Sequence, residues 1–372
     1  MMLLKNLGQT GIKISAIGQG MCIHNALTKQ EKYQNLEHTI LTGIDVGMNF
    51  IDTAPVYGCG ESESVIGRAV KTIRKQVVLA TKVSPECLSA TGIAASVKAS
   101  LKRLRTDWVD LLQIHWPNPK IPLPETLAAM ENLVNDGAVR CLGVCNFSFK
   151  ETQAIQRQLP PNLLASVQVE YNLFDRSIEG EFLSFGQEED ISIIAYSPLH
   201  RGRIVANQNQ YAVLQEMANK YQKTPAQIVL RWLTEAQPVV VIPNTTNSQR
   251  MIENAQSMDF NLDRDDVLSL AERCTGHLLN VSPRCIRVAE DSGRSVYRTL
   301  EEALANTLNC VPSPQDLAKE IEMGGFLKPV RLRPSGNSRE RFELLEGRIR
   351  YWAWVIAHGF EKPLPALIED FS

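Results

Sequence analysis

Residues 77–115, with the sequence VVLATKVSPECLSATGIAASVKASLKRLRTDWVDLLQIH, contain one strand–helix–strand unit that decides the fold. The two ends of this stretch, 77–81 and 109–114, are short and mostly apolar runs. Such runs are typical of parallel strands that are buried on both faces of a sheet. Between them, residues 90–104 have the length of a helix. The stretch therefore predicts two parallel strands joined by a helical crossover.

The same alternation extends in both directions from this unit. Further short apolar runs lie at 16–18, 50–52, 141–144, 166–169, 191–195 and 239–242. Further segments of helical length lie at 28–46, 62–74, 123–134, 148–158 and 224–233. This repeated alternation predicts an α/β fold, a closed parallel (β/α)8 TIM barrel, which we assign to residues 1–275. Two short apolar runs around residues 8–11 predict a small hairpin before the barrel.

The pattern changes after about Gly276. Strands are expected at 286–288, 329–333 and 342–345, and helices at 300–308, 315–322 and 348–357. This mixed order predicts a small α+β domain over residues 280–372 instead of a continued barrel.

Composition excludes several functional classes. The 372 residues carry a net charge of −2, which gives no general attraction to nucleic acid or to an anionic membrane. Every apolar run is far shorter than the roughly 20 residues of a membrane span. The N-terminus lacks the apolar segment of a secretory signal, and the eight cysteines form no CxxC pair. We therefore expect a cytoplasmic protein with reduced thiols and no metal site.

Four polar residues fall where chemistry occurs in such a barrel, at the C-terminal ends of strands. Asp52 ends the second predicted strand, and Tyr57 follows it in the next loop. Lys82 ends the third strand, and His115 ends the fourth. An Asp–Lys pair alone is more often structural, and a histidine before Trp-Pro is usually a packed rim residue. The four together, at successive strand ends, predict an active site.

The combined chemistry of these side chains suits the reduction of a carbonyl group. The pKa of a free phenol is near 10, so Tyr57 needs a changed environment to donate a proton. A buried Lys82 ammonium is expected to lower that pKa, while Asp52 holds the ammonium in place. Tyr57 can then protonate the carbonyl oxygen, to which His115 can donate a hydrogen bond. Hydride transfer requires a nicotinamide cofactor, because side chains cannot supply a hydride.

A series of motifs follows one another along the first 275 residues: GMNFIDTA at 47–54, ATK at 80–82, DLLQIHWP at 110–117, GVCNF at 143–147, QVEYN at 168–172, AYSPL at 195–199 and IPNTTN at 242–247. With these motifs the chain resembles the aldo-keto reductase family. The resemblance implies that the catalytic tetrad is Asp52, Tyr57, Lys82 and His115, with Tyr57 as the general acid.

The same resemblance implies a cofactor site. Asn146 and Gln168 match residues that bond the nicotinamide carboxamide, and Tyr196 matches the aromatic residue that stacks on the nicotinamide ring. Further cofactor contacts are implied along the pyrophosphate and adenosine, at Ser197, Leu199, Asn244, Thr245, Arg250 and Asn254.

Two departures from the family pattern lie in this site. Asn244 stands where the family often has a lysine that pairs with the 2′-phosphate of NADP. Arg250 can bind that phosphate through two N–H groups, so the residues favour NADPH and leave NADH open. Cys145 stands beside Asn146 in place of the more usual serine, and we expect the carboxamide contact to be retained.

Residues 280–372 resemble the ParB/sulfiredoxin-like fold through a Gly-x-x-Arg-x-x-Ala element that begins at Gly347, and through its flanking segments. Backbone N–H groups at a helix start, together with Arg348 and Arg350, can bind an anion. In the resembled family this element binds nucleoside triphosphates, so Gly347 and Arg350 are candidate phosphate contacts. A glycine before a helix is also commonly only a turn, and arginines interleaved with glutamates often form a solvated face.

Two features of this domain narrow its expected function. The element lacks the cysteine that sulfiredoxin chemistry needs, and no helix-turn-helix region follows it. We therefore expect no sequence-specific DNA binding, and both nucleotide sensing and a structural role stay open.

The sequence as a whole predicts an NAD(P)H-dependent reductase of a small aldehyde or ketone. One alternative is a regulatory protein that senses nicotinamide redox state or a nucleotide, and such a protein has no need of Tyr57. Another alternative is a nucleotide-handling enzyme centred on Arg350. The identity of the carbonyl substrate does not follow from the sequence.

Overall fold

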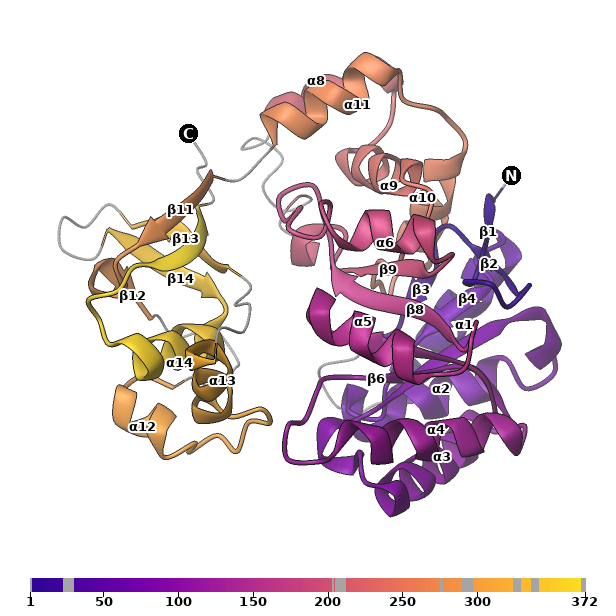
Figure 1. Ribbon diagram of the computed structural model, residues 1–372. Coiled ribbons are helices and arrows are strands. Elements are labelled where there is room, and N and C mark those ends of the chain that lie inside the picture. The colour runs from indigo at the N-terminus through magenta and orange to yellow at the C-terminus, as the bar shows by residue number, and fades with distance from the viewer. Residues whose placement is uncertain are drawn as a thin grey trace. The chain divides into compact units, whose positions relative to one another are not determined.

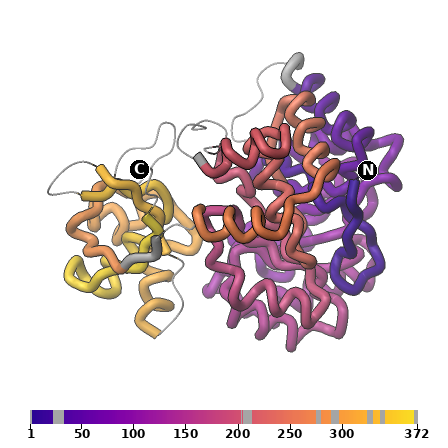
Figure 2. The backbone as a smooth tube through the Cα atoms, turned by 90° about the horizontal axis from the view of Figure 1, so that it is seen from above, coloured from indigo at the N-terminus to yellow at the C-terminus, as the bar shows by residue number. Residues whose placement is uncertain are grey.

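A computed structural model describes residues 2–22, 30–202, 204, 212–274, 277–288, 297–323, 329–335 and 341–368. The chain divides into two compact units, Met1–Arg273 and Cys274–Ser372 (Figures 1 and 2). Each unit has its own main sheet and its own hydrophobic core. No helix in these described ranges has the length and apolarity that crossing a bilayer requires.

Parallel strands of the first unit form one eight-stranded sheet within the described residues, in the order β10-β9-β8-β7-β6-β5-β4-β3. They are β3 (Gln19–Gly20), β4 (Phe50–Asp52), β5 (Val78–Val83), β6 (Val109–Ile114), β7 (Val139–Cys145), β8 (Leu164–Glu170), β9 (Ser192–Tyr196) and β10 (Val239–Val241). Two parallel bridges, from Ile17 to Val241 and from Gly20 to Asn244, join the last strand to the first. The sheet is therefore closed, which confirms the predicted barrel and brings all C-terminal strand ends to one rim.

Helices surround this barrel (Figure 1). They are α1 (Gln30–Asp45), α2 (Glu61–Ala69), α3 (Ala90–Leu104), α4 (Leu123–Asn135), α5 (Phe149–Gln158), α6 (Phe182–Glu188), α8 (Ala212–Tyr221), α9 (Pro225–Glu235), α10 (Ser248–Ala255) and α11 (Arg264–Arg273). Capping explains where two of them begin. Ser148 and Glu151 form a reciprocal capping box at the start of α5, and Thr224 and Gln227 form one at the start of α9.

A hairpin lies at the N-terminal ends of the barrel strands. Its strands β1 (Leu4–Asn6) and β2 (Lys13–Ser15) pair antiparallel, as predicted. Leu7 and Ile14 are fully buried and belong to the core inside the barrel. The buried Lys5 ammonium donates to three backbone carbonyls that follow or end α9, those of Thr234, Ala236 and Val239. The hairpin therefore packs against the N-terminal end of the barrel, and its Lys5 supplies hydrogen-bond donors to the carbonyl groups at the C-terminus of α9.

Most predicted bounds in the barrel lie within two residues of the observed ones, but those of the first strand and of α2 differ more. The first strand is Gln19–Gly20 instead of 16–18, and Ile17 makes only a single bridge. A Cβ at Gly20 would lie 2.6 Å from the Ile242 carbonyl oxygen, so the close approach that closes the barrel here needs glycine. Helix α2 ends at Ala69 instead of residue 74, because the chain then turns into a short 3-10 helix at Arg74–Gln76.

The second unit contains a five-stranded mixed sheet in the order β11-β15-β13-β14-β12. Its elements are β11 (His277–Val281), β12 (Ile286–Arg287), α12 (Leu300–Leu304), α13 (Pro314–Glu322), β13 (Val330–Pro334), β14 (Phe342–Glu346), α14 (Arg348–His358) and β15 (Leu364–Ile368). Tyr351 and Trp352 of α14 pack into a core with side chains of the sheet. The sequence pattern indicated neither β11 nor β15, and the predicted end of α12 was four residues too late.

Candidate active site

The structure brings the four predicted catalytic residues together at the C-terminal rim of the barrel. Asp52 is the last residue of β4, and Tyr57 begins the short 3-10 helix Tyr57–Gly60 that follows it. Lys82 lies one residue before the end of β5, and His115 directly follows β6. Because β4, β5 and β6 are hydrogen-bonded neighbours, their ends place these side chains side by side.

Asp52 and Lys82 form a buried ion pair. The Lys82 Nζ donates to Asp52 Oδ2 over 2.5 Å and to the Thr53 carbonyl oxygen over 3.1 Å. Burial lowers the pKa of Lys82, but the charge and hydrogen bond of Asp52, together with Tyr57 and Cys145, outweigh burial, so the pKa ends above its ordinary value. Lys82 is therefore a fixed positive charge at neutral pH.

Tyr57 lies beside this ammonium, with 5.2 Å between the Lys82 Nζ and the centre of the Tyr57 ring. Burial raises the pKa of the Tyr57 phenol well above its ordinary value, although the Lys82 charge acts to lower it. The expectation of a phenol more acidic than usual was therefore wrong. The reason is that the loss of water by the buried phenol outweighs the Lys82 charge, and the nearby Asp52 carboxylate raises the pKa further. Tyr57 consequently keeps its proton at neutral pH.

His115 faces Tyr57 across the site. Their ring centres are 5.7 Å apart and the rings are nearly perpendicular, while the other neighbour, Trp116, stacks on the imidazole at 3.8 Å. Burial and the Lys82 charge lower the pKa of His115 to about 2. Its Nδ1 is buried and has no hydrogen-bond partner among the described residues. His115 is thus a neutral imidazole that can donate one hydrogen bond but carries no surplus proton.

Gln113, which was not among the predicted site residues, lies in the same buried layer. Its Nε2 donates to Asp52 Oδ1 over 2.9 Å. Gln168, predicted as a cofactor contact, donates to the same oxygen over 2.8 Å and to Gln113 Oε1 over 3.2 Å. A glutamine inside the otherwise apolar end of β6 was the signal that could have indicated Gln113, because buried amides need polar partners.

Asn146 and Tyr196, two further predicted cofactor residues, contact each other at the same rim. The Tyr196 hydroxyl donates to Asn146 Oδ1 over 2.8 Å, and Asn146 Nδ2 donates to the His115 carbonyl oxygen over 3.0 Å. Asn146 has a φ of 64°, in the left-handed region that asparagine tolerates better than most residues. The neighbouring Cys145 is fully buried, and its Sγ lies 3.1 Å from Asn146 Nδ2. These hydrogen bonds link the ends of β7 and β9 to His115.

The remaining predicted cofactor residues follow β9 and β10. Ser197 and Leu199 lie in the turn after β9, where Ser197 has a φ of 51°. Asn244 is exposed, and its Nδ2 donates to the Cys22 carbonyl oxygen over 2.8 Å. This bond joins the ends of β10 and β3.

Helix α10 begins just after this bond. Thr245 is buried, and its Oγ1 accepts from the Asn247 backbone N–H, while Asn247 in turn caps the helix. Arg250 lies exposed in the first turn, and Asn254 lies buried one turn later. An exposed arginine near a helix N-terminus at the barrel rim is an arrangement that suits a phosphate.

In the second unit, Gly347 is the N-cap of α14 and has a φ of 93°, which only glycine adopts readily. Arg350 lies in the first turn of that helix. One of its guanidinium nitrogens donates to the Pro329 carbonyl oxygen over 2.8 Å, and another lies 3.4 Å from Glu346 Oε1. The two predicted phosphate contacts are therefore neighbours, and Arg350 already has protein partners.

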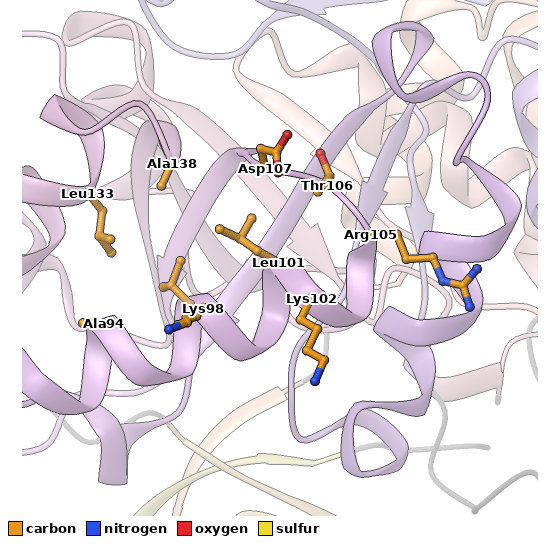
Figure 3. Close-up of a pocket in the computed structure, with 10 residues that line it drawn as sticks. Ala94, Lys98, Leu101, Lys102, Arg105, Thr106, Asp107, Leu133 and Ala138 are labelled. Carbon is orange, nitrogen blue, oxygen red and sulfur yellow. The ribbon is translucent and has the colours of Figure 1, made fainter.

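Two open hollows of the barrel unit lie away from the tetrad. One, of about 500 Å³, is lined by α3 together with Thr106 and Ala138, which precede strands (Figure 3). The other, of about 550 Å³, includes Val78 and Arg140 near the starts of strands. Both hollows lie toward the N-terminal strand ends, and no tetrad residue lines either of them. The described residues also contain no group of three or more His, Cys, Asp or Glu side chains that could hold a metal.

Comparisons with known proteins agree with this barrel. The model of the aldo/keto reductase family matches residues 16–273. Methylglyoxal reductase YeaE of Escherichia coli (strain K12) is 32% identical over 260 residues, which cover 70% of this chain and 90% of that protein. The NADH-specific methylglyoxal reductase of Escherichia coli (strain K12) is 27% identical over 314 residues, covering 72% of this chain and 94% of that protein.

A solved structure agrees as well. The aldo/keto reductase from Klebsiella pneumoniae in complex with NADP and acetate is 32% identical, with a TM-score of 0.68 over 72% of this chain and 94% of its own. The family match, together with the closed (β/α)8 barrel, identifies the chain as an oxidoreductase. The chain belongs to the aldo/keto reductase family, whose members are NAD(P)-dependent oxidoreductases.

Proposed function

We propose that this protein reduces a small aldehyde or ketone to an alcohol, with NADPH as the hydride donor and Tyr57 as the proton donor. One observation carries the proposal: the buried Asp52–Lys82 pair lies against a protonated phenol, across from a neutral imidazole.

Tyr57 is the best proton donor of the four side chains. His115 is neutral, because its pKa is lowered to about 2, and it can only donate a hydrogen bond to the carbonyl oxygen. Lys82 holds its proton tightly, because it is bonded to Asp52 and to the Thr53 carbonyl oxygen. Tyr57 is half-buried and can reach a ligand. As its proton moves to the carbonyl oxygen, the Lys82 charge stabilises the phenolate that remains, and water restores the proton later.

The rim residues fit a nicotinamide dinucleotide. Bound there, the cofactor would supply a hydride to the carbonyl carbon. Among the residues that the structure describes, the hydrogen-bonding neighbour of Gln168 Oε1 is the weak thiol donor of Cys145 at 3.6 Å, so this oxygen is available to accept from a carboxamide N–H. The half-buried ring of Tyr196 offers a flat surface at the end of β9, and the exposed Arg250 suits the 2′-phosphate. The NADH-specific relative leaves NADH open.

The second unit carries a separate proposal. We keep the resemblance to the ParB/sulfiredoxin-like fold, with a nucleotide phosphate held at Gly347 and Arg350. The left-handed Gly347 at the start of α14 favours an anion there, because free backbone N–H groups point along the helix axis. The existing bonds of Arg350 to Pro329 and Glu346 weigh against it.

The experiment that tests the main proposal is a titration followed by a turnover screen. NADPH and NADH are titrated into the full-length protein, and small aldehydes, with methylglyoxal first because two relatives are methylglyoxal reductases, are then screened for NADPH oxidation. We expect turnover with NADPH, and an Arg250→Ala variant should bind NADPH about tenfold more weakly while NADH binding changes little. Tight cofactor binding without turnover of any aldehyde or ketone would favour a nicotinamide sensor instead.

A further inference from the structure

We propose that Gln113 is a positioning residue that locks the Gln168 amide against the Asp52–Lys82 pair and thereby presents Gln168 to the cofactor as a hydrogen-bond acceptor. The inference rests on the proposed function, because it assigns a role in that same site. It adds a residue of β6 that touches neither the cofactor nor the substrate.

The relevant atoms form one closed layer inside the barrel. Gln168 Nε2 donates to Asp52 Oδ1 over 2.8 Å and to Gln113 Oε1 over 3.2 Å. Gln113 Nε2 donates to the same Asp52 oxygen over 2.9 Å. The other carboxylate oxygen of Asp52 accepts from Lys82 over 2.5 Å. All four side chains are at least 98% buried, so no water can replace a lost partner without entering the core.

This pattern fixes which way the Gln168 amide points. An amide has donors on one side and an acceptor on the other, and both Asp52 Oδ1 and Gln113 Oε1 are acceptors. Rotating the Gln168 amide by half a turn would set its oxygen against two other oxygens in a dry environment, which is strongly unfavourable. The Gln168 oxygen therefore faces the opposite way, where Cys145 Sγ at 3.6 Å is its neighbour. Gln113 is thus one of two groups that hold this orientation.

The same bonds tie cofactor contact to proton donation. One Asp52 oxygen accepts from the two glutamines, and the other accepts from Lys82. A shift of the glutamines would therefore move the Asp52 carboxylate and, with it, the Lys82 ammonium beside Tyr57. Gln113 therefore connects the group that would orient the nicotinamide with the group that stabilises the phenolate. A glutamine that merely filled space in β6 would have no such effect.

The first test is Gln113→Leu, which keeps most of the side-chain volume and removes both hydrogen bonds of the Gln113 amide, to Asp52 and to Gln168. NADPH binding is measured by fluorescence titration, independently of turnover. We expect the dissociation constant for NADPH to rise about tenfold, because the Gln168 amide loses one of the two acceptors that hold its oxygen toward the cofactor. An unchanged dissociation constant would overturn the proposal.

The second test is Gln113→Glu, which has the same shape. When protonated, the introduced carboxyl can still donate to Asp52 and accept from Gln168, so binding near pH 6 should resemble that of the wild type. Burial and the Asp52 charge raise the pKa of the introduced carboxyl, and its ionisation at higher pH sets two carboxylates side by side. We expect NADPH binding to weaken at least fivefold between pH 6 and pH 9, in this variant only. A flat pH dependence would contradict the assigned role.

The matched control is Gln19→Leu, another fully buried glutamine of the barrel. Gln19 lies in β3, and its Nε2 donates to the Ile40 and Met48 backbone carbonyls on the helix side. Its loss should lower the thermal midpoint but leave the NADPH dissociation constant within about twofold. If both leucine variants weaken NADPH binding equally, the effect is general destabilisation and the inference fails. If the wild-type protein binds no NADPH at all, the proposed function fails first, and the two failures are thereby distinguished.

Discussion

Two opposing effects act on the Tyr57 hydroxyl, and their balance decides what the residue can do. Burial raises the pKa of the phenol, and the Lys82 ammonium lowers it by a smaller amount. A phenol with a raised pKa is a weak acid in the ground state but is fully protonated. Donation then becomes favourable only as negative charge develops on the carbonyl oxygen, which is where a reductase needs it.

The pH dependence of reduction follows from these side chains. Because the pKa of His115 is lowered to about 2, no proton is gained or lost there between pH 5 and pH 9. Because the pKa of Tyr57 is raised above its ordinary value near 10, the acid form persists over the same range and is lost only at higher pH. We expect kcat/KM for reduction at saturating NADPH to stay flat from pH 6 to pH 9. A rise of kcat/KM on acidification with a midpoint near 6.5 would instead identify His115 as the acid.

That the four tetrad residues lie together could be predicted from the sequence, because they mark strand ends in a repeated strand–helix pattern, whereas their catalytic roles stay a prediction. Gln113 could be noticed as a polar residue in an apolar strand, but its partners, Asp52 and Gln168, could not be predicted, because they come from other strands of the barrel. The direction of the pKa shift of Tyr57 could not be predicted from the sequence either, since it depends on how much water burial removes from the phenol. The roles of the cofactor residues stay predictions, although Gln168, Asn146 and Tyr196 do lie at the tetrad.

At the scale of elements, capping places the residues that follow β7. Ser148 caps α5 by accepting from the Glu151 backbone N–H, and Glu151 bonds back to the Ser148 backbone. The box begins two residues after Asn146, so it limits how the end of β7 can move.

The capping box gives a stability prediction. Ser148→Ala should lower the free energy of unfolding by about 1 kcal/mol, because a helix N-terminal N–H loses its acceptor. Urea denaturation measures this change. Ser184→Ala, at an exposed position inside α6, is the control and should change the free energy of unfolding by less than about 0.5 kcal/mol. Equal effects in the two variants would contradict the assigned role of the cap.

Elements with strong local signals were predicted well. Helix α3 begins and ends where expected, and the starts of α5 and α9 follow their capping residues. The first barrel strand was misplaced because its position depends on the close approach of β10 at Gly20, a contact between distant parts of the chain. Strand β15 was missed because Pro365 interrupts its apolar run.

At the scale of the whole molecule, the barrel gathers residues that are far apart in the chain. Asp52 and Gln168 are 116 positions apart and share a hydrogen bond. The parallel sheet closes between β3 and β10, so the C-terminal ends of all its strands lie on one rim and bring these residues together. The barrel was predictable from strand–helix alternation, whereas the order of strands in the second unit required the structure.

The most direct test of the account is the rate of reduction by Tyr57→Phe, measured with the aldehyde that the wild-type protein turns over best. We predict that kcat falls by about 10²- to 10⁴-fold, the usual contribution of a general acid, while the NADPH dissociation constant stays within about twofold. Tyr33→Phe, which removes a hydroxyl that donates a hydrogen bond to Glu61, serves as the control and should keep the wild-type rate. A Tyr57→Phe variant that reduces the aldehyde at the wild-type rate would show that the proton comes from elsewhere.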